Sequence, residues 1–242
     1  MKASMWPEAI RESFPKVFLF LCCGLCSVNL SSGQTVAELQ AARDRGDSAA
    51  IDRLIAQANG TAETPEGQYK LALAYSYGAE VAMEGRDKKK SEALAEKGLE
   101  FAQKAVGANG GNAEFHRLQG ALCGQVIPAN PIMGALKYGQ CARDEINKAI
   151  QLNPNLALAY VTRGVGNSYL PASMDGGVEI AAKDFDKAIT LDPKLADAYL
   201  WKGVTLRKAN RIGEARQALE QAAKLAPNRV WIKEQLQKLP PQ

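Results

Sequence analysis

The chain has 242 residues, a formal net charge of +4 and five cysteines, and 46% of its residues are hydrophobic. This length and apolar share suffice for a folded core, while the small and evenly spread charge argues against a nucleic-acid-binding protein. Alanine is frequent and runs of β-branched residues are few, so we predict an all-α protein without a sheet.

The first segment of the chain resembles a secretory signal. An apolar run over residues 17–28 is followed by small residues at 31–33, which suit a cleavage site ahead of Gln34. The run is too short to span a bilayer, for which about 20 apolar residues are needed. We therefore predict that residues 1–33 are a signal peptide and that the mature protein is exported, either to the periplasm or out of the cell.

Two alternatives for this segment stay open. It can remain uncut, as an anchor or as a buried helix, and its cysteines, Cys22, Cys23 and Cys26, also suggest a lipoprotein. Lipoprotein signals usually place a small residue before the cysteine, whereas a leucine precedes Cys22 and Cys26. Cleavage and export are the interpretation we favour.

The next segment, residues 34–60, has the apolar spacing of a polar helical pair that caps the N-terminal end of the protein. The apolar positions of the pair are Val36, Leu39 and Ala42 on the first helix and Ile51, Leu54 and Ile55 on the second. Residues 61–112 contain Gly98, Ala102, Ala105 and Gly110, an incomplete copy of a pattern that the rest of the chain repeats. We expect Ala72 and Tyr75 on the first helix of this degenerate unit.

Three full copies of the pattern follow, each an aromatic residue or His, Gly four residues later, then Ala, a bulky apolar residue, Ala and Pro. The copies are His116, Gly120, Ala142, Ile146, Ala149, Pro154; Tyr160, Gly164, Ala181, Phe185, Ala188, Pro193; and Tyr199, Gly203, Ala215, Leu219, Ala222, Pro227. The first Ala and the Pro are 12 residues apart in every copy, whereas Gly and that Ala are 22, 17 and 12 residues apart. Insertions confined to one joint are typical of a repeat array.

The pattern resembles the tetratricopeptide repeat (TPR), whose unit is about 34 residues long. The last copy matches this length, and the first departs from the family with His116 and Ile146 where aromatic residues are usual. The resemblance covers about residues 66–229 and implies a right-handed, all-α solenoid of stacked antiparallel helix hairpins. The expected units are 113–156, 157–195 and 196–229, closed by a capping helix and tail at 230–242.

Local chemistry supports such hairpins. Small residues at the repeat positions let neighbouring helices approach closely, and the Pro after each second helix ends it because proline lacks the N–H of the next hydrogen bond. A single hairpin cannot bury its apolar face, so the units must stack. We expect one elongated array.

Cys123 and Cys141 flank the longest joint, and both remain after signal cleavage. In an oxidising compartment they can form a disulfide that closes this joint. The alternative is a pair of buried thiols that serve as small apolar residues. The sequence does not separate the two.

The sequence offers little chemistry for catalysis. The single histidine, His116, occupies an aromatic core position of a repeat, which favours a packed structural role. No Cys/His cluster has metal-ligand spacing, and no nucleophile elbow, phosphate-binding loop or dinucleotide fingerprint occurs. We predict a protein that is not an enzyme and that needs no cofactor and no metal.

The TPR resemblance implies that first helices line a concave groove that binds a protein or peptide. The groove positions would be Arg117, Ala121, Val161, Val165, Tyr169, Leu200, Val204 and Arg207. These side chains predict an apolar floor with basic residues nearby, suited to an amphipathic helix or to a small apolar ligand with an acidic end. The alternative is that they pack against the ends or inserted loops of the array itself.

The inserted joints, residues 125–136 and 170–178, distinguish this array from a generic scaffold. Asn130 and Pro131 predict a helix start, so the second helix of the first full repeat should extend over residues 131–152. The second joint also weakly resembles the T component of TPR-associated TRAP transporters. That resemblance implies an alternative function, a periplasmic binder of a small apolar or acyl-like ligand, which would need an enclosed apolar cavity under the joints.

Overall fold

The computed structural model describes residues 32–60 and 62–241, with side chains described from residue 36 onward. The apolar run of the predicted signal, its cysteines and the alternatives for them lie outside the described residues. Within the described ranges no helix is long and apolar enough to cross a membrane.

The described residues form 11 α-helices and two short 3-10 helices, with no strand among them. The α-helices are α1 (Ser32–Asp44), α2 (Ser48–Asn59), α3 (Pro65–Glu84), α4 (Lys88–Ala108), α5 (Ala113–Val126), α6 (Pro131–Leu152), α7 (Ala157–Tyr169), α8 (Val178–Leu191), α9 (Ala196–Lys208), α10 (Ile212–Leu225) and α11 (Val230–Gln237). The 3-10 helices, η1 (Ile127–Ala129) and η2 (Ala172–Met174), lie within the two inserted joints.

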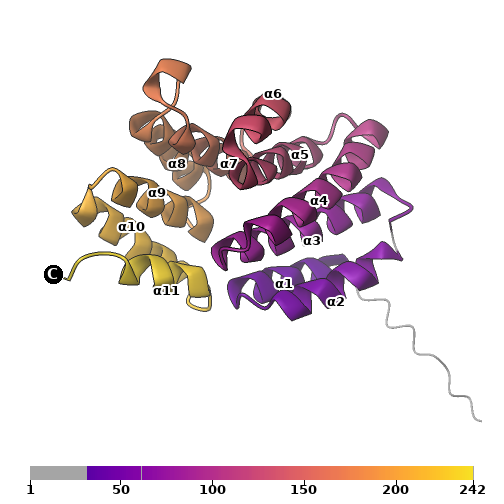
Figure 1. Cartoon of the computed structure of the whole chain (residues 1–242), viewed down its shortest axis with the longest axis horizontal. Helices are drawn as coiled ribbons and strands as arrows, with labels where there is room; N and C mark the ends of the chain where they lie inside the picture. The colour runs from indigo at the N-terminus through magenta and orange to yellow at the C-terminus, as the bar shows by residue number, and fades with distance from the viewer. Residues whose placement is uncertain (1–31, 61, 242) are drawn as a thin grey trace, which may run out of the picture.

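Successive helices pair into antiparallel hairpins from α1–α2 to α9–α10, and α11 packs against the last hairpin (Figure 1). First helices of neighbouring hairpins also contact one another, as α5 contacts α7 and α7 contacts α9. The predicted all-α solenoid with a C-terminal capping helix is therefore confirmed.

Capping residues explain where several helices begin. The side chains of Asp47, Thr64, Asp87 and Asn112 each accept a hydrogen bond from a main-chain N–H in the first turn of the following helix. Such caps satisfy donors that have no partner inside the helix. Asn130 does the same for α6, and Pro131 occupies its first turn, so α6 covers the range that the sequence predicts.

The repeat positions form the contacts between the helices of each hairpin. Phe185, Ala188, Leu219 and Ala222 are fully buried. The glycines on the first helices allow this close packing: a Cβ atom added at Gly164 would lie 2.7 Å from a ring carbon of Phe185. The recurring spacing within the chain thus serves helix-to-helix contact.

The array curves until its two ends meet, and α11 lies beside the α1–α2 hairpin (Figure 1). The expectation of an elongated array is wrong in this respect. Where the ends meet, charged side chains from α1, α3, α9 and the turn before α11 form hydrogen bonds between them.

Candidate functional site

The predicted groove residues do not form one open surface. Arg117, Val161, Leu200 and Val204 are at most 5% exposed and belong to the interior of the array. Ala121, Val165 and Arg207 are half-buried, and only Tyr169 is well exposed, at 63%. Leu200 and Val204 pack with Ile232 and Leu239 of the C-terminal end, which is the alternative weighed for these residues, whereas Val161 packs in the core of its own and the following repeat.

Arg117 has a partner within its own helix. Its Nε donates a hydrogen bond to Glu114, and the Tyr69 hydroxyl donates another to the same carboxylate, over 3.5 Å. Burial is the largest single influence and would lower the pKa of Arg117, but the charge and hydrogen bond of Glu114, together with Tyr69, outweigh it, and that pKa lies above its ordinary value. Burial, followed by Glu114, raises the pKa of Tyr69 to about 12. At this part of the concave face the charged side chain of Arg117 is therefore buried and already paired with Glu114.

A cluster of charged residues joins the two ends of the array, and we call it the end-to-end cluster. Arg43 in α1 donates from Nη1 to Asp197 in α9 over 3.0 Å. Arg229, in the turn before α11, donates from Nη2 to Glu80 in α3 over 2.8 Å and also to Glu84. The cluster consists of Arg43, Asp44, Glu80, Glu84, Asp197 and Arg229.

Arg229 also bonds to the main chain. Its Nη1 donates to the carbonyl oxygen of Arg43 over 2.9 Å, in the last turn of α1. Helix C-termini carry partial negative charge on such carbonyl groups, so a buried guanidinium is well placed there. Arg229 is 1% exposed, and it contacts α1 both at the Arg43 carbonyl oxygen and at the Asp44 carboxylate.

Burial and charge shift the carboxyl groups of the cluster in opposite directions. Burial, together with the nearby charge of Glu80, raises the pKa of Glu84 to about 8, against the opposing effect of Arg229. Burial is the largest single influence and would raise the pKa of Asp197, but Arg43 and Arg229, with a smaller contribution from Arg117, together hold that pKa below its ordinary value. Asp197 is thus a firmly ionised partner, whereas Glu84 retains a proton near neutral pH.

Sequence reasoning missed the end-to-end cluster. Arg43 is a polar residue near the end of a predicted helix, and Arg229 follows the Pro of the last repeat by two residues. Neither belongs to a motif. The only signal in the sequence was the position of Asp197, three residues before Leu200, on the face that TPR proteins turn inward.

The first inserted joint exposes apolar side chains. Gly134 packs against the main chain of Ile127, where a Cβ atom would lie 2.8 Å from the Cα atom. This contact fixes the free end of α6 and turns Ile132, Met133 and Leu136 outward, where they are 76%, 59% and 76% exposed. We call these three residues the α6 patch.

The second joint adds further exposed apolar residues. Tyr169 ends α7 and is covered on one face by the Lys208 ammonium, 3.9 Å from the ring centroid. Met174, in η2, is 55% exposed. In Figure 1, α6 and the loop between α7 and α8 project from the same rim of the array.

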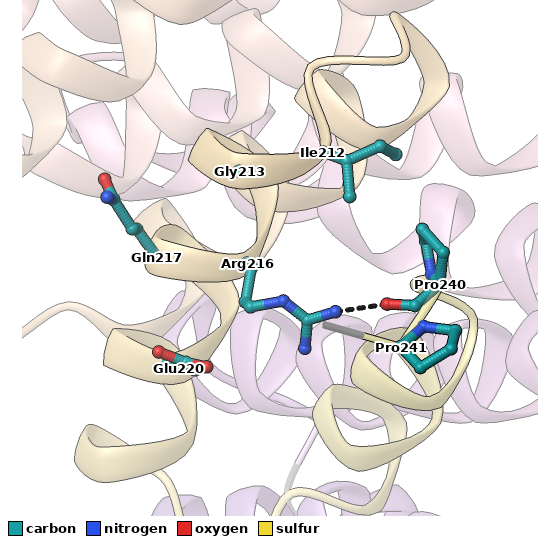
Figure 2. Close-up of a pocket in the computed structure, with 7 residues that line it drawn as sticks. All are labelled: Ile212, Gly213, Arg216, Gln217, Glu220, Pro240 and Pro241. Atoms are coloured by element: carbon teal, nitrogen blue, oxygen red, sulfur yellow. Dashed lines mark hydrogen bonds between the residues drawn. The ribbon is translucent and has the colours of Figure 1, made fainter.

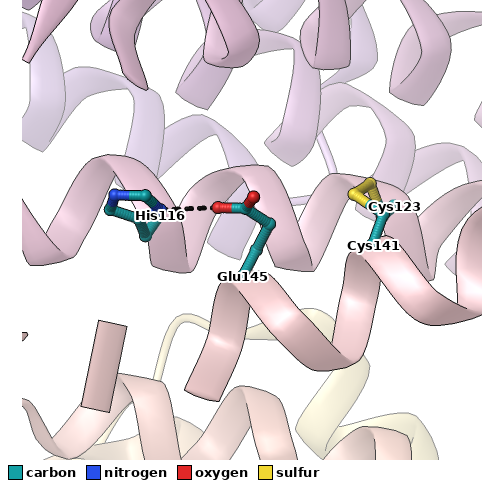
Figure 3. The surroundings of a disulfide bond; sticks show 4 residues. All are labelled: His116, Cys123, Cys141 and Glu145. Carbon is teal, nitrogen blue, oxygen red and sulfur yellow. Dashed lines mark hydrogen bonds and ion pairs between the residues drawn. A yellow bond between two sulfur atoms is a disulfide. The ribbon is translucent and has the colours of Figure 1, made fainter. Parts of the chain in front are cut away.

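Cys123 and Cys141 form a disulfide between α5 and α6 (Figure 3). On the same two helices, His116 Nδ1 lies 2.6 Å from Glu145 Oε2, and His116 Nε2 lies 2.9 Å from the carbonyl oxygen of Gly110. His116 is 7% exposed, so both ring nitrogens have partners inside the protein. The bridge and the histidine together tie the long α6 to α5.

Two cavities lie away from the joints. One, of about 500 Å³, lies between α10 and the C-terminal tail, where Arg216 donates to the carbonyl oxygen of Pro240 (Figure 2). The other, of about 430 Å³, lies between α1 and the turns that precede α9 and α11. Neither is lined by residues of the inserted joints, where the small-ligand alternative would need its cavity. Over the described ranges, no group of three or more His, Cys, Asp or Glu residues is arranged to hold a metal ion.

Comparison with solved structures shows the fold. A thermophilic TPR protein of Thermus thermophilus is 16% identical, with a TM-score of 0.53 over 85% of this chain and 92% of that one. The HusA haemophore of Porphyromonas gingivalis is 20% identical, with a TM-score of 0.52 over 88% of this chain and all of that one. The resemblance to TRAP transporter components finds no support among these proteins and stays a prediction.

Sequence comparison with protein families and with individual relatives shows the family as well as the fold. A model of the tetratricopeptide repeat matches residues 185–217. Regulator of microtubule dynamics protein 3 of Xenopus laevis is 32% identical over 96 residues, and its Bos taurus counterpart is 33% identical over the same length. These matches cover 40% of this chain but only 20% of each relative. The family model for regulator of microtubule dynamics protein 1-3 matches residues 34–166, more than half of the chain. The chain is thus a TPR protein, and it belongs to the family of regulator of microtubule dynamics proteins 1-3.

Proposed function

We propose that the chain is a non-catalytic scaffold that binds a protein or peptide with an apolar helical face through its inserted joints. The observation that carries the proposal is the α6 patch, three neighbouring apolar side chains that are each more than half exposed. Contiguous exposed apolar residues on a soluble protein mark interaction sites. Helical repeat arrays generally act by presenting extended binding surfaces.

The geometry of the α6 patch favours a helical partner. Ile132 and Leu136 are four residues apart in α6, so they lie on one stripe of the helix, with Met133 beside them. A stripe of this kind packs into the ridges and grooves of another helix. The exposed Tyr169 and Met174 at the second joint extend the apolar surface available to the partner.

The predicted groove has a smaller part in this proposal. Two residues of its floor, Leu200 and Val204, are buried in the apolar core of the C-terminal end and are out of reach of a partner. Val165 and Tyr169 lie where the groove meets the second joint, and we propose that they contact the partner there.

The proposal is tested by capture of interacting proteins with matched variants of α6. Leu136→Arg places a charge in the α6 patch, whereas Gln140→Arg places the same charge one turn further along the helix at another exposed position. Because neither side chain belongs to the core, both variants should keep the helicity of the native protein in circular dichroism.

We expect one set of proteins to be captured by the native chain and by Gln140→Arg, and to be lost with Leu136→Arg. Met133 replaced by a photo-crosslinking amino acid should form an adduct with a member of that same set. Equal capture by the two arginine variants would reject the α6 patch as the binding site.

We further propose that the protein is exported after cleavage ahead of Gln34. The apolar run at 17–28 supports this proposal, and so does the Cys123–Cys141 disulfide, since such bonds persist in oxidising compartments. The mass of the protein recovered from its native host should correspond to residues 34–242, and without reductant it should contain no reactive thiol. A mass that retains residue 1 would exclude cleavage.

The family name adds one element to the proposal. The relatives are named for the regulation of microtubule dynamics, and this chain matches about a fifth of their length. We propose that the part matched by the family model, residues 34–166, supplies an interaction module, because it contains the N-terminal hairpin and the first repeats, from α1 into α7. The activity of the complete relatives is not assigned to this chain.

A further inference from the structure

We propose that the end-to-end cluster is a conformational latch. It holds the first and last hairpins together and keeps the concave face closed, and its release opens that face without unfolding the repeats. The latch differs from the α6 patch in position and in chemistry, and it does not depend on the identity of the partner. Four structural features support it.

First, the two ends have separate apolar cores. The core of the N-terminal end contains Leu39, Ile51 and Leu71, whereas that of the C-terminal end contains Leu200, Leu219 and Ile232. No described residue belongs to both of these clusters. The packing that stabilises each end is therefore complete without the other, and parting the ends leaves both hydrophobic cores intact.

Second, the contacts across the seam are made by long charged side chains. Arg43 reaches Asp197, and Arg229 reaches Glu80, Glu84 and the Arg43 carbonyl oxygen. A buried ion pair adds little net stability, because desolvation offsets most of the attraction, but loss of one partner leaves an unpaired buried charge. Exposure to water lowers the free energy of such an unpaired charge, and here the charge reaches water when the two ends separate.

Third, the charges of the cluster do not balance. Four carboxyl groups, of Asp44, Glu80, Glu84 and Asp197, face two guanidinium groups, of Arg43 and Arg229. The raised pKa of Glu84, caused by burial and by Glu80, is the response to this excess. With more carboxyl than guanidinium groups buried together, the cluster holds the ends less firmly than a balanced set of ion pairs would.

Fourth, the seam is loosely packed. The cavity of about 430 Å³ lies between α1, which contributes Gln40, Arg43 and Asp44, and the two turns that precede α9 and α11. Water in such a polar cavity reaches the edge of the cluster.

The latch is tested by hydrogen exchange on the complete chain with two single variants. Asp197→Asn keeps the shape of the side chain and removes the charge that holds Arg43, and Arg229→Gln breaks the contacts from the other end. Arg211→Gln is the control, because it removes an arginine of the same C-terminal region whose ion pairs, with Glu179 and Glu214, are exposed.

We expect both latch variants to exchange the amide protons of α1 and α11 at least about tenfold faster than the native chain, with unchanged rates in α7 and α8. Their radius of gyration in solution scattering should increase, and Arg211→Gln should match the native protein in both measurements. Native-like exchange at the ends in Asp197→Asn and Arg229→Gln would overturn the latch. General loss of helicity or faster exchange throughout would overturn it as well, because the cluster would then be part of the folding unit.

Discussion

At the scale of single residues, two glycines of α7 show how local space decides the effect of a methyl group. A Cβ atom at Gly164 would lie 2.7 Å from the fully buried Phe185 ring, whereas one at Gly166 would meet nothing within 4 Å. We expect Gly164→Ala to lower the free energy of unfolding by about 1–3 kcal/mol through overpacking. Gly166→Ala should raise it by up to about 1 kcal/mol, because alanine favours the helix.

Urea denaturation of the two variants measures this difference. The substitutions are chemically identical and lie two residues apart on one helix, so differences in the unfolded state largely cancel. Equal stability of Gly164→Ala and Gly166→Ala would show that the α7–α8 contact is looser than the structure indicates.

Glu84 predicts how stability depends on pH. Its pKa is raised to about 8 by burial and by Glu80, against Arg229 and Arg43 and with a smaller contribution from Asp197. A folded-state pKa above the unfolded value means that the proton stabilises the folded form. This contribution is fully present below about pH 4.5, the ordinary value for Glu, and is lost as the pH rises through about 8.

Glu84→Gln should therefore flatten the pH dependence of the unfolding free energy between about pH 4.5 and 8, because the amide resembles the protonated acid. Unfolding by urea at a series of pH values gives the two slopes. Glu100→Gln, the same chemical change on the exposed side of α4, should leave the native slope in place. A Glu84→Gln profile parallel to the native one would rule out this role of Glu84.

At the scale of helices, the disulfide ties the longest helix hairpin together. Cys123 and Cys141 are separated by 18 residues. A disulfide that closes a loop of this length stabilises the folded protein by about 3 kcal/mol, because it restricts the unfolded chain. The double variant Cys123→Ala/Cys141→Ala should lose about that much free energy of unfolding. Reductant should destabilise the native chain and leave the variant unchanged, and a reductant effect on both would mean that the bridge is not its cause.

The helices were predictable from the sequence because their signals are local. Asn130 and Pro131 define the start of α6, and the spacing of Ala, a bulky residue and Ala defines the buried stripe of each second helix. The exposure of the α6 patch was not predictable from periodicity, since it depends on Gly134 packing against Ile127 in a joint that no regular repeat contains.

The site at the concave face was predicted less well. Residues such as Leu200 were expected on an accessible groove floor and are instead buried, because they pack in the apolar core that α9 and α10 form with α11. The Arg229 contact with the Arg43 carbonyl oxygen joins residues 186 positions apart. Such a contact has no local signature, since neither arginine differs in sequence context from a solvated one.

At the scale of the whole molecule, closure changes how stability is shared along the chain. In an open solenoid each repeat interacts only with its neighbours, so a perturbation at one end reaches the other through every intervening hairpin. Here the first and last hairpins are also direct neighbours through the end-to-end cluster. The chain should therefore behave as a ring of interactions, in which loosening either end weakens the contacts of the other.

A double-mutant cycle between the two ends measures this coupling. Ile51 in α2 and Ile232 in α11 are buried in different cores, and Ile→Val at each should cost about 0.5–1.5 kcal/mol. For an open array the two costs should add within about 0.3–0.5 kcal/mol. For the closed array we expect a departure from additivity larger than that margin, because each substitution also loosens the seam that the other end shares.

The same cycle in the Arg229→Gln background should return to additivity, since the ends are then no longer in direct contact. Additivity in the native background would mean that the seam transmits no free energy between the ends, and equal coupling in both backgrounds would assign the coupling to the hairpins between them.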